Sequence, residues 1–171
     1  KAYVNNGGDT AFHLASNELV NALIFAPTVG QFTMRGTAPY RGVATSGWQG
    51  RSHSLGIADS VSVVAKDAAS ADVAATLIAN SVDLPCHPAI ERVAAKRLSP
   101  DSDLGDKQIT TGVGSLSSAE VVSALNNGMN FAKATLERRL IAGALLALRS
   151  EIRHVGVANE IVSSCRNKGL N

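Results

Sequence analysis

SVSVVAKDAASADVAATLIAN, residues 60–80 of the 171-residue chain, contains a strand pattern followed directly by a helix pattern. Residues 60–65 alternate with a period of two, which predicts a strand. Residues 67–80 are mostly Ala with Leu and Ile and contain no Gly or Pro, which predicts a helix. Asp67 or Ser70 can cap its first turn. The stretch therefore predicts a strand that leads directly into a helix.

Weaker patterns before and after this stretch predict further strands. Residues 2–5 have the composition of a strand that ends at Gly-Gly, and 11–26 fits strands joined by a polar turn at 16–18. Pro and Gly divide 27–42 into short extended pieces, and 108–113 is a further strand. Because the chain opens inside a strand without an initiator Met, we expect that a segment upstream of it has been lost.

The last third of the chain contains a second helix signal. Ser117 and Glu120 form a capping box, so a helix begins there, and Gly128 is a plausible stop before a further helix over 129–139. Two apolar runs then fit either a β-hairpin or a buried helix followed by a strand. These runs cover 140–148 and 152–157.

The composition is that of one ordinary globular domain, which we assign to 1–157, with a polar tail over 158–171. The 16 Lys and Arg nearly balance the 14 Asp and Glu, which excludes a nucleic-acid binder that relies on a basic patch. Two cysteines are too few for a disulfide scaffold and fit a reducing compartment. No apolar run reaches the roughly 20 residues of a membrane helix, and no signal peptide is visible. We therefore expect a cytoplasmic protein without a membrane partner.

Asp72, Thr76 and Asn80 form a polar stripe on the otherwise apolar helix, because their spacing of four residues places them on one face. A buried carboxylate without a partner would be costly. Something must therefore satisfy Asp72: a cation, a bound metal ion, backbone donors or water. Asp and Thr oxygens suit Mg²⁺ or Ca²⁺ better than Zn²⁺. A solvated polar face on an amphipathic helix is the open alternative.

Glycine-rich segments supply a second candidate site. Residues 44–53 combine glycines with hydroxyls and an Arg, a composition that fits a cradle for phosphate or an ordinary loop. His53, in this segment, is a candidate acid, base or ligand. The segment Gly7-Gly8-Asp9 either allows close backbone approach to a ligand or forms a tight turn.

Other polar clusters have simpler interpretations. The acidic turn at 100–106 lacks the glutamate that would complete a Ca²⁺ loop, so we interpret it as a solvated turn. Cys86 lies between prolines, and we expect it to be packed rather than reactive. Arg138 and Arg139 are expected on a solvated helix face.

Several of these segments, taken in chain order, match a known pattern. The segments that match a broad superfamily are VNNGGD (4–9), VATSG (43–47), SVVA (62–65) and ADVAAT (71–76). The segments that match one branch of it are SLGIAD (54–59), HPAI (87–90), PDSDLGD (100–106), LIAGA (140–144) and VG (155–156). The chain resembles the ApbE-like superfamily, best known for its FAD:protein FMN transferases. It resembles the UPF0280 branch most. The similarity covers nearly all of 2–157.

The resemblance implies an α+β fold with an antiparallel sheet and packed helices, and a first half of the fold that is absent from this chain. In the transferases, the Asp and Thr of an Ala-Asp-x-x-x-Thr motif bind Mg²⁺, which matches Asp72 and Thr76. The Gly-Gly-Asp and Thr-Ser-Gly segments would line the flavin site; they correspond to Gly7, Gly8, Asp9, Thr45, Ser46 and Gly47. His53 corresponds best to a His that precedes Ile-Asp-Pro in the transferases, whereas Ser-Leu-Gly follows it here.

Three functional hypotheses follow. The first is an ApbE-like protein that binds FAD, FMN or a related phosphate-bearing small molecule with Mg²⁺, with transferase activity. The second is a metal-optional hydrolase of a small amide or lactone, with His53 as acid and base. The third is a non-catalytic half of an assembly with a separate N-terminal chain. We expect a homo- or hetero-oligomer and no nucleic-acid partner.

Overall fold

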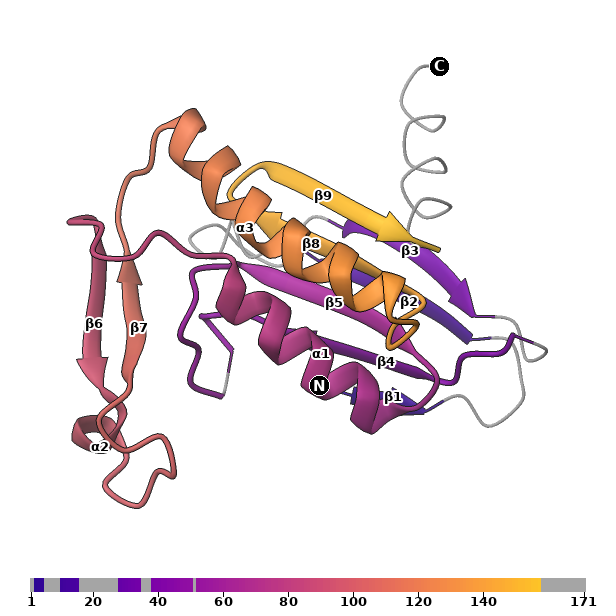
Figure 1. Cartoon of the computed structure of the whole chain (residues 1–171), viewed down its shortest axis with the longest axis horizontal. Coiled ribbons are helices and arrows are strands. Elements are labelled where there is room, and N and C mark those ends of the chain that lie inside the picture. Colours follow the sequence, from indigo (N-terminus) through magenta and orange to yellow (C-terminus); the bar gives the residue numbers. More distant parts are fainter. Residues whose placement is uncertain (1, 5–9, 16–27, 35–37, 51, 158–171) are drawn as a thin grey trace.

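The computed structural model describes residues 2–4, 10–15, 28–34, 38–50 and 52–157 (Figure 1). Its elements are β1 (Ala2–Val4), β2 (Thr10–Ala15), β3 (Thr28–Met34), β4 (Gly42–Ser46), β5 (Ser60–Ala65), α1 (Ala68–Ser81), β6 (Ile90–Ala94), α2 (Ala95–Leu98), β7 (Gln108–Val113), α3 (Ser118–Glu137), β8 (Gly143–Leu148) and β9 (Glu151–Gly156). The expected turn at 16–18, the segment Gly7-Gly8-Asp9 and the tail at 158–171 lie outside the described residues.

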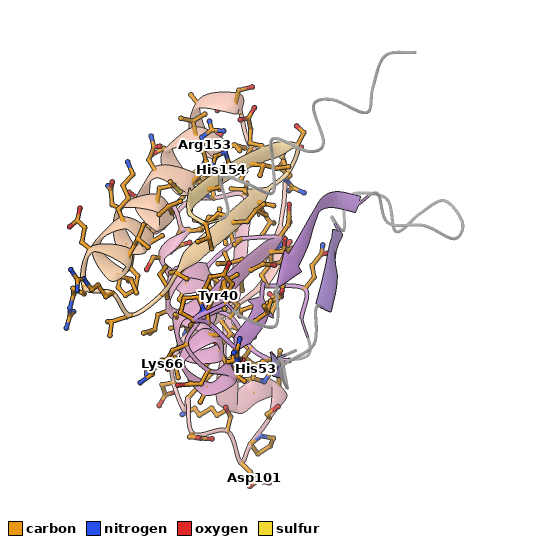
Figure 2. The ribbon with its side chains drawn as sticks, turned by 90° about the vertical axis from the view of Figure 1, so that its right-hand side faces the viewer. Tyr40, His53, Lys66, Asp101, Arg153 and His154 are labelled. Atoms are coloured by element: carbon orange, nitrogen blue, oxygen red, sulfur yellow. The ribbon has the colours of Figure 1, made fainter. Side chains whose placement is uncertain are left out.

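A five-stranded antiparallel sheet forms the middle of the described structure, with strand order β1-β4-β5-β8-β9. Helices α1 and α3 cover one face, and the β2–β3 hairpin lies on the opposite side (Figure 1; Figure 2). The β6–β7 hairpin projects beyond the end of this sheet, with α2 at its far end (Figure 1). The antiparallel sheets and packed helices confirm the α+β class.

The main core lies between the sheet and the two long helices. Alternate residues of β5, including Val61 and Val63, are fully buried against alanines of α1 such as Ala71 and Ala75. Small side chains let the helix backbone approach the sheet closely, so the Ala-rich composition of α1 is explained by packing. Ile78 adds a large buried side chain to the same face.

The β8–β9 hairpin settles the ambiguity of the two apolar runs in favour of strands. All six residues of β8 are buried. A strand that is covered on both faces has no need of polar alternation, and its sequence is then a continuous apolar run. Arg149 makes the turn between the two strands with a positive φ of 56°.

Both long helices begin where local signals predicted. The Asp67 carboxylate accepts a hydrogen bond from the Ser70 backbone N–H at 2.7 Å, and this bond holds the pKa of Asp67 below its ordinary value. At α3, the Ser117 and Glu120 side chains each accept a hydrogen bond from the other residue's backbone N–H, so the capping box is confirmed.

The expected stop of α3 at Gly128 is wrong, since one helix continues through this residue to Glu137. Gly128 is buried, and a Cβ at this position would lie 2.3 Å from Cγ2 of Val82 and 2.9 Å from Cδ2 of Leu146. The glycine is therefore there for close packing rather than for helix termination.

The β6 and α2 segments were not foreseen as a strand and a helix, whereas β7 matches the expected strand at 108–113. The β6–β7 hairpin shifts register between Glu91 and Arg92, and this irregularity weakens the strand pattern in the sequence. Within the described part of the chain, none of the helices is both long enough and apolar enough to cross a membrane.

Candidate functional site

A cavity of about 310 Å³ opens where the end of β4, the loop after it and one face of α1 meet. Hydroxyls, glycine backbone, an imidazole and one carboxylate form its lining. The lining residues are Thr45, Ser46, Gly47, Gly50, Ser52, His53, Asp72 and Thr76. Six of them are residues that the sequence singled out, and the structure brings these six together: Thr45, Ser46, Gly47, His53, Asp72 and Thr76.

The strand and helix of residues 60–80 also build this cavity. Strand β5 pairs with β4 and leads into α1, which packs back over both strands. Thr45 lies opposite Ser62 in the β4–β5 ladder, and their hydroxyl oxygens are 2.8 Å apart. A Cβ on Gly47 would lie 2.3 Å from the carbonyl oxygen of Asp59, so this turn out of β4 requires glycine.

Asp72 and Thr76 lie one helical turn apart on the exposed face of α1 and both line the cavity. Their side chains are exposed to solvent, as expected for the polar face of an amphipathic helix. They also line a cavity, as expected for residues that bind a metal ion. The two interpretations are therefore compatible in this structure. A solvated carboxylate at the mouth of a cavity needs no buried partner and remains available to a cation.

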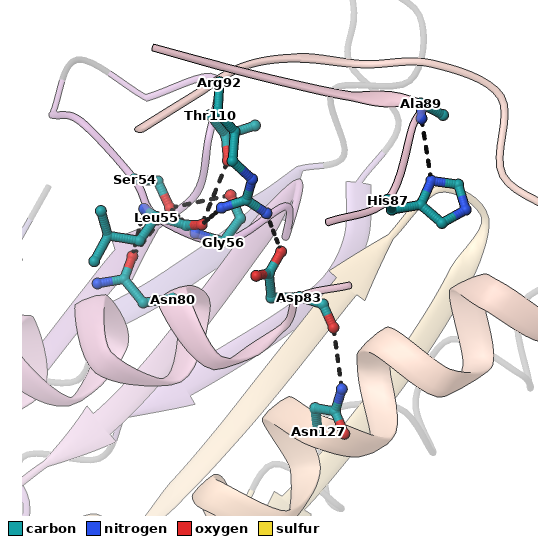
Figure 3. Close-up of polar contacts among 10 residues, drawn as sticks. All are labelled: Ser54, Leu55, Gly56, Asn80, Asp83, His87, Ala89, Arg92, Thr110 and Asn127. Carbon is teal, nitrogen blue, oxygen red and sulfur yellow. Dashed lines mark hydrogen bonds and ion pairs between the residues drawn. The ribbon is translucent and has the colours of Figure 1, made fainter. Parts of the chain in front are cut away.

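Asn80, the third residue of the stripe, has a different role. Its side-chain Oδ1 accepts hydrogen bonds from the Leu55 backbone N–H at 2.9 Å and from the Ser54 hydroxyl at 3.2 Å (Figure 3). It therefore holds the loop that follows His53 and does not line the cavity. A Cβ on Gly56 of this loop would lie 2.1 Å from the carbonyl oxygen of Ala79, so the loop packs directly on α1.

The β6–β7 hairpin holds the same loop from its other side (Figure 3). The Thr110 backbone N–H donates to the Ser54 carbonyl at 2.8 Å. The Arg92 guanidinium donates to the Leu55 carbonyl and pairs with the half-buried carboxylate of Asp83. Two elements that are distant in sequence therefore fix the backbone beside His53.

His53 is half-buried at the edge of the cavity, and its Nε2 lies 3.1 Å from the Ser99 hydroxyl. Ser99 follows α2 directly, so this bond also comes from the projecting hairpin. One ring nitrogen is thus oriented by the protein, an arrangement that suits a positioned acid or base.

Asp59 is a buried carboxylate next to this site that the sequence reasoning missed. It is 7% exposed; its Oδ1 accepts a hydrogen bond from the Trp48 indole N–H at 3.2 Å, and its Oδ2 accepts one from the Arg149 backbone N–H. These bonds tie the loop after β4 to the β8–β9 turn. The sequence did offer one signal for this residue: a single Asp that directly follows apolar residues and precedes a strand.

His87 and Glu120 form a separate pair at the start of α3, away from the cavity lining. His87 Nδ1 accepts from the Ala89 backbone N–H, so Nε2 carries the proton that it donates to Glu120 at 2.8 Å. This bond, with those from Ser117, lowers the pKa of Glu120 to about 2. The neighbouring Cys86 is exposed, so the expectation of a packed cysteine is wrong.

A family model described as AbpE bacteria matches residues 1–154, a span that includes the cavity and all but the end of β9. The chain belongs to this ApbE-like family. A curated relative is the UPF0280 protein of Methanothermobacter thermautotrophicus, 41% identical over 90 residues. That match covers 48% of this chain and 33% of the relative, so the chain spans about a third of the relative's length. No solved structure matches the chain significantly.

These matches confirm the resemblance from which the Mg²⁺ and flavin sites were expected. The residues that line the cavity show whether a metal ion fits there. Carboxylate and hydroxyl oxygens converge in this ApbE-like chain, and Mg²⁺ prefers such ligands. Among the residues that the structure describes, no cluster of three or more His, Cys, Asp or Glu side chains fits a metal ion. Asp72 is the single carboxylate among the described residues of the lining. These donors fit an ion that keeps water molecules and ligand oxygens in its coordination shell, rather than one coordinated by protein side chains alone.

Proposed function

We propose that this ApbE-like chain binds a phosphate-bearing small molecule, FAD, FMN or a relative of one, together with Mg²⁺ in the cavity at the end of β4. The observation that carries the proposal is the convergence on one cavity of Asp72, Thr76 and the Thr-Ser-Gly segment. In such a site Asp72 and Thr76 would hold the metal ion. The metal would supply positive charge that neutralises phosphate oxygens.

The charge of the lining sharpens the proposal. Among the described residues that line the cavity, Asp72 contributes a negative charge. A phosphate group alone would meet repulsion from this carboxylate. A divalent ion held by Asp72 and Thr76 would supply positive charge that offsets this repulsion. Metal and phosphate ligand should therefore bind cooperatively.

The glycine backbone supports the ligand half of the proposal. Gly47 and Gly50 place backbone along the cavity without side chains, and Ser46 and Ser52 add hydroxyls. Backbone N–H groups and hydroxyls of this kind are common phosphate and ribose contacts. A cavity of about 310 Å³ is at the lower end of small-molecule sites, which suits one part of a dinucleotide rather than the whole of it.

The test is a titration of the intact chain with FAD, followed by flavin fluorescence, in Mg²⁺ and in EDTA. We expect Mg²⁺ to tighten FAD binding by about tenfold or more, and Asp72→Asn to abolish that dependence while leaving the fold intact. Asp101→Asn is the matched control, because Asp101 is an exposed carboxylate at the far tip of the molecule (Figure 2). Equal FAD binding in EDTA, or none with Mg²⁺, Mn²⁺ or Ca²⁺, would overturn the proposal.

Further ligands identify which part of FAD is recognised. FMN, ADP and riboflavin should be titrated under the same conditions. If the phosphate carries the interaction, FMN and ADP bind with Mg²⁺ dependence and riboflavin does not. Transferase activity is then assayed as loss of FAD, release of AMP and covalent transfer of FMN to an acceptor hydroxyl.

The hydrolase alternative rests on one specific observation, the hydrogen bond that orients His53 at the cavity edge. An oriented imidazole can accept and return a proton during attack of water on an amide or lactone. In that case His53→Ala abolishes turnover of such substrates while Mg²⁺-dependent FAD binding is unchanged. Turnover that survives His53→Ala removes this alternative.

A further inference from the structure

A second concavity, of about 520 Å³, lies between α1 and α3 and takes no part in the proposed function. We call it the interhelical groove. Its lining residues are Lys66, Ala69, Ser70, Val73, Ala74, Leu77, Phe131, Thr135, Arg138, Arg139 and Leu140. Val73 directly follows Asp72 of the cavity and Leu77 directly follows Thr76, so the two sites occupy adjacent faces of α1.

The floor of the interhelical groove is apolar and exposed. Val73 is 60% exposed, Leu77 47%, Phe131 40% and Leu140 51%. Within the described part of the chain, these four and Leu98 are the large hydrophobic residues that remain exposed. Four of the five thus gather in one concavity. Scattered apolar residues are ordinary on a protein surface, whereas a contiguous patch marks a binding surface.

One end of the groove is cationic. The first turn of α1 and the last turn of α3 lie at the same end of the helix layer (Figure 1), which brings Lys66, Arg138 and Arg139 to that end. The described residues of this lining include no carboxylate. Lys66 itself forms a long ion pair: the Asp67 carboxylate lies 3.9 Å from Lys66 Nζ and also accepts a hydrogen bond from the Ser70 N–H.

The backbone at the end of α3 gives Arg139 a second distinguishing feature. Arg139 has a positive φ of 58°, a conformation that favours glycine. Its N–H donates to the Leu136 carbonyl and the Leu140 N–H donates to the Thr135 carbonyl, the pattern of a Schellman motif. Cations at a helix C-terminus also interact well with the helix dipole. Dipole compensation does not explain why a cation occupies the glycine position, or why the apolar floor beside it is exposed.

We propose that the interhelical groove binds a single-chain amphiphile with an anionic head group, of the fatty-acid class. The hydrocarbon chain lies along the floor formed by Val73, Leu77 and Phe131. The carboxylate lies at the cationic end, between Lys66 and the two arginines. Charge complementarity selects this occupant: the hydrocarbon chain buries the exposed apolar floor, and the head group meets the cations Lys66, Arg138 and Arg139.

The experiment is calorimetric titration of the intact chain with dodecanoate below its micellar concentration. We expect saturable binding of dodecanoate, binding weaker by about tenfold or more for the uncharged dodecanol, and no binding of acetate, which lacks the chain. Chemical shifts of backbone amides should change along α1 and the end of α3 rather than at Thr45 and Ser46. Absence of saturable dodecanoate binding would overturn the proposal.

Paired variants separate the floor from the cationic end. Leu77→Gln and the double variant Arg138→Gln, Arg139→Gln should each weaken dodecanoate binding by about tenfold or more. All three residues are exposed, so these variants should fold normally. Leu98→Gln and Arg97→Gln are the matched controls, since both residues are exposed on α2 outside the groove. An equal loss in the controls, or no loss in the groove variants, would contradict the assignment. Asp72→Asn should leave dodecanoate binding unchanged.

Discussion

The two concavities on adjacent faces of α1 differ in how the chain builds them. The cavity at the end of β4 is polar, contains the carboxylate of Asp72 and is held by a network of buried hydrogen bonds and tightly packed glycines. The interhelical groove is apolar, carries three cations and is formed by side chains that project from two regular helices. The cavity therefore depends on loop geometry that only tertiary contacts can fix. The groove depends on helix positions and should survive most changes in those loops.

The largest expected effect comes from Gly56, in the loop that follows His53. A Cβ on Gly56 would meet three backbone atoms, the carbonyl oxygens of Ala79 and Val82 and Cα of Asn80, at 2.1–2.9 Å. Backbone cannot move aside as a flexible side chain can, so Gly56→Ala should lower the free energy of unfolding by about 3 kcal/mol or more. Urea denaturation measures the change.

Gly112→Ala is the matched control for this substitution. There the new Cβ would meet the far end of the Glu91 side chain, which is exposed and can rotate away. We expect a loss below about 1 kcal/mol. If Gly56→Ala folds as stably as Gly112→Ala, the loop does not pack rigidly on α1, and the contrast between the two sites fails.

A second, smaller loss is expected at Asp59. Asp59→Ala leaves the Trp48 indole and the Arg149 backbone N–H without their acceptor, so the free energy of unfolding should fall by about 2–3 kcal/mol. Trp48 is the single Trp of the chain, so its emission reports the loop directly. We expect a red-shifted emission and weaker Mg²⁺-dependent FAD binding, with dodecanoate binding retained. Loss of both ligands together would show that the two sites are not independent.

These residues also show what the sequence could and could not predict. The cap at Asp67 and the box at Ser117 involve donors and acceptors a few residues apart, so local sequence was sufficient. Gly128 has the same local signature as a helix stop. Its role in close packing depends on Val82 and on a strand that comes later in the chain, which no local pattern contains.

The candidate site divides in the same way. The spacing of Asp72 and Thr76 fixes a shared helix face, and their match to the ApbE-like motif predicted that this face belongs to a site. That Asn80 turns to the Leu55 loop instead depends on where β4 and the β6–β7 hairpin lie. Asp59 was missed because its partners, Trp48 and Arg149, are brought together only by the folded sheet.

Arg139→Gly should change stability and groove binding in opposite directions. Glycine adopts the positive φ at this helix end without strain, so we expect the free energy of unfolding to rise by about 1 kcal/mol. The same change removes one of the three cations, so dodecanoate should bind more weakly. Thermal denaturation and calorimetry measure the two effects. Arg138→Gly is the control, because Arg138 has a negative φ of −76° and should gain no stability. If Arg139→Gly gains stability and binds dodecanoate as before, this residue serves the helix end and not the groove.

The smallest expected effect is the acid dependence that Glu120 gives to the start of α3. Hydrogen bonds from His87 and Ser117 lower its pKa from 4.5 to about 2 in the folded state. A depressed folded pKa means that the carboxylate stabilises the fold above about pH 4.5, and that this contribution is lost as the pH falls toward 2. In Glu120→Gln the stability should therefore depend less on pH across this interval, as urea denaturation at several pH values would show. Because Glu120 lies at the opposite end of α3 from the cationic end of the groove, the variant should bind dodecanoate and Mg²⁺-FAD at neutral pH like the unmodified chain. An altered affinity for either ligand would mean that α3 couples the two faces of α1, and their independence would have to be abandoned.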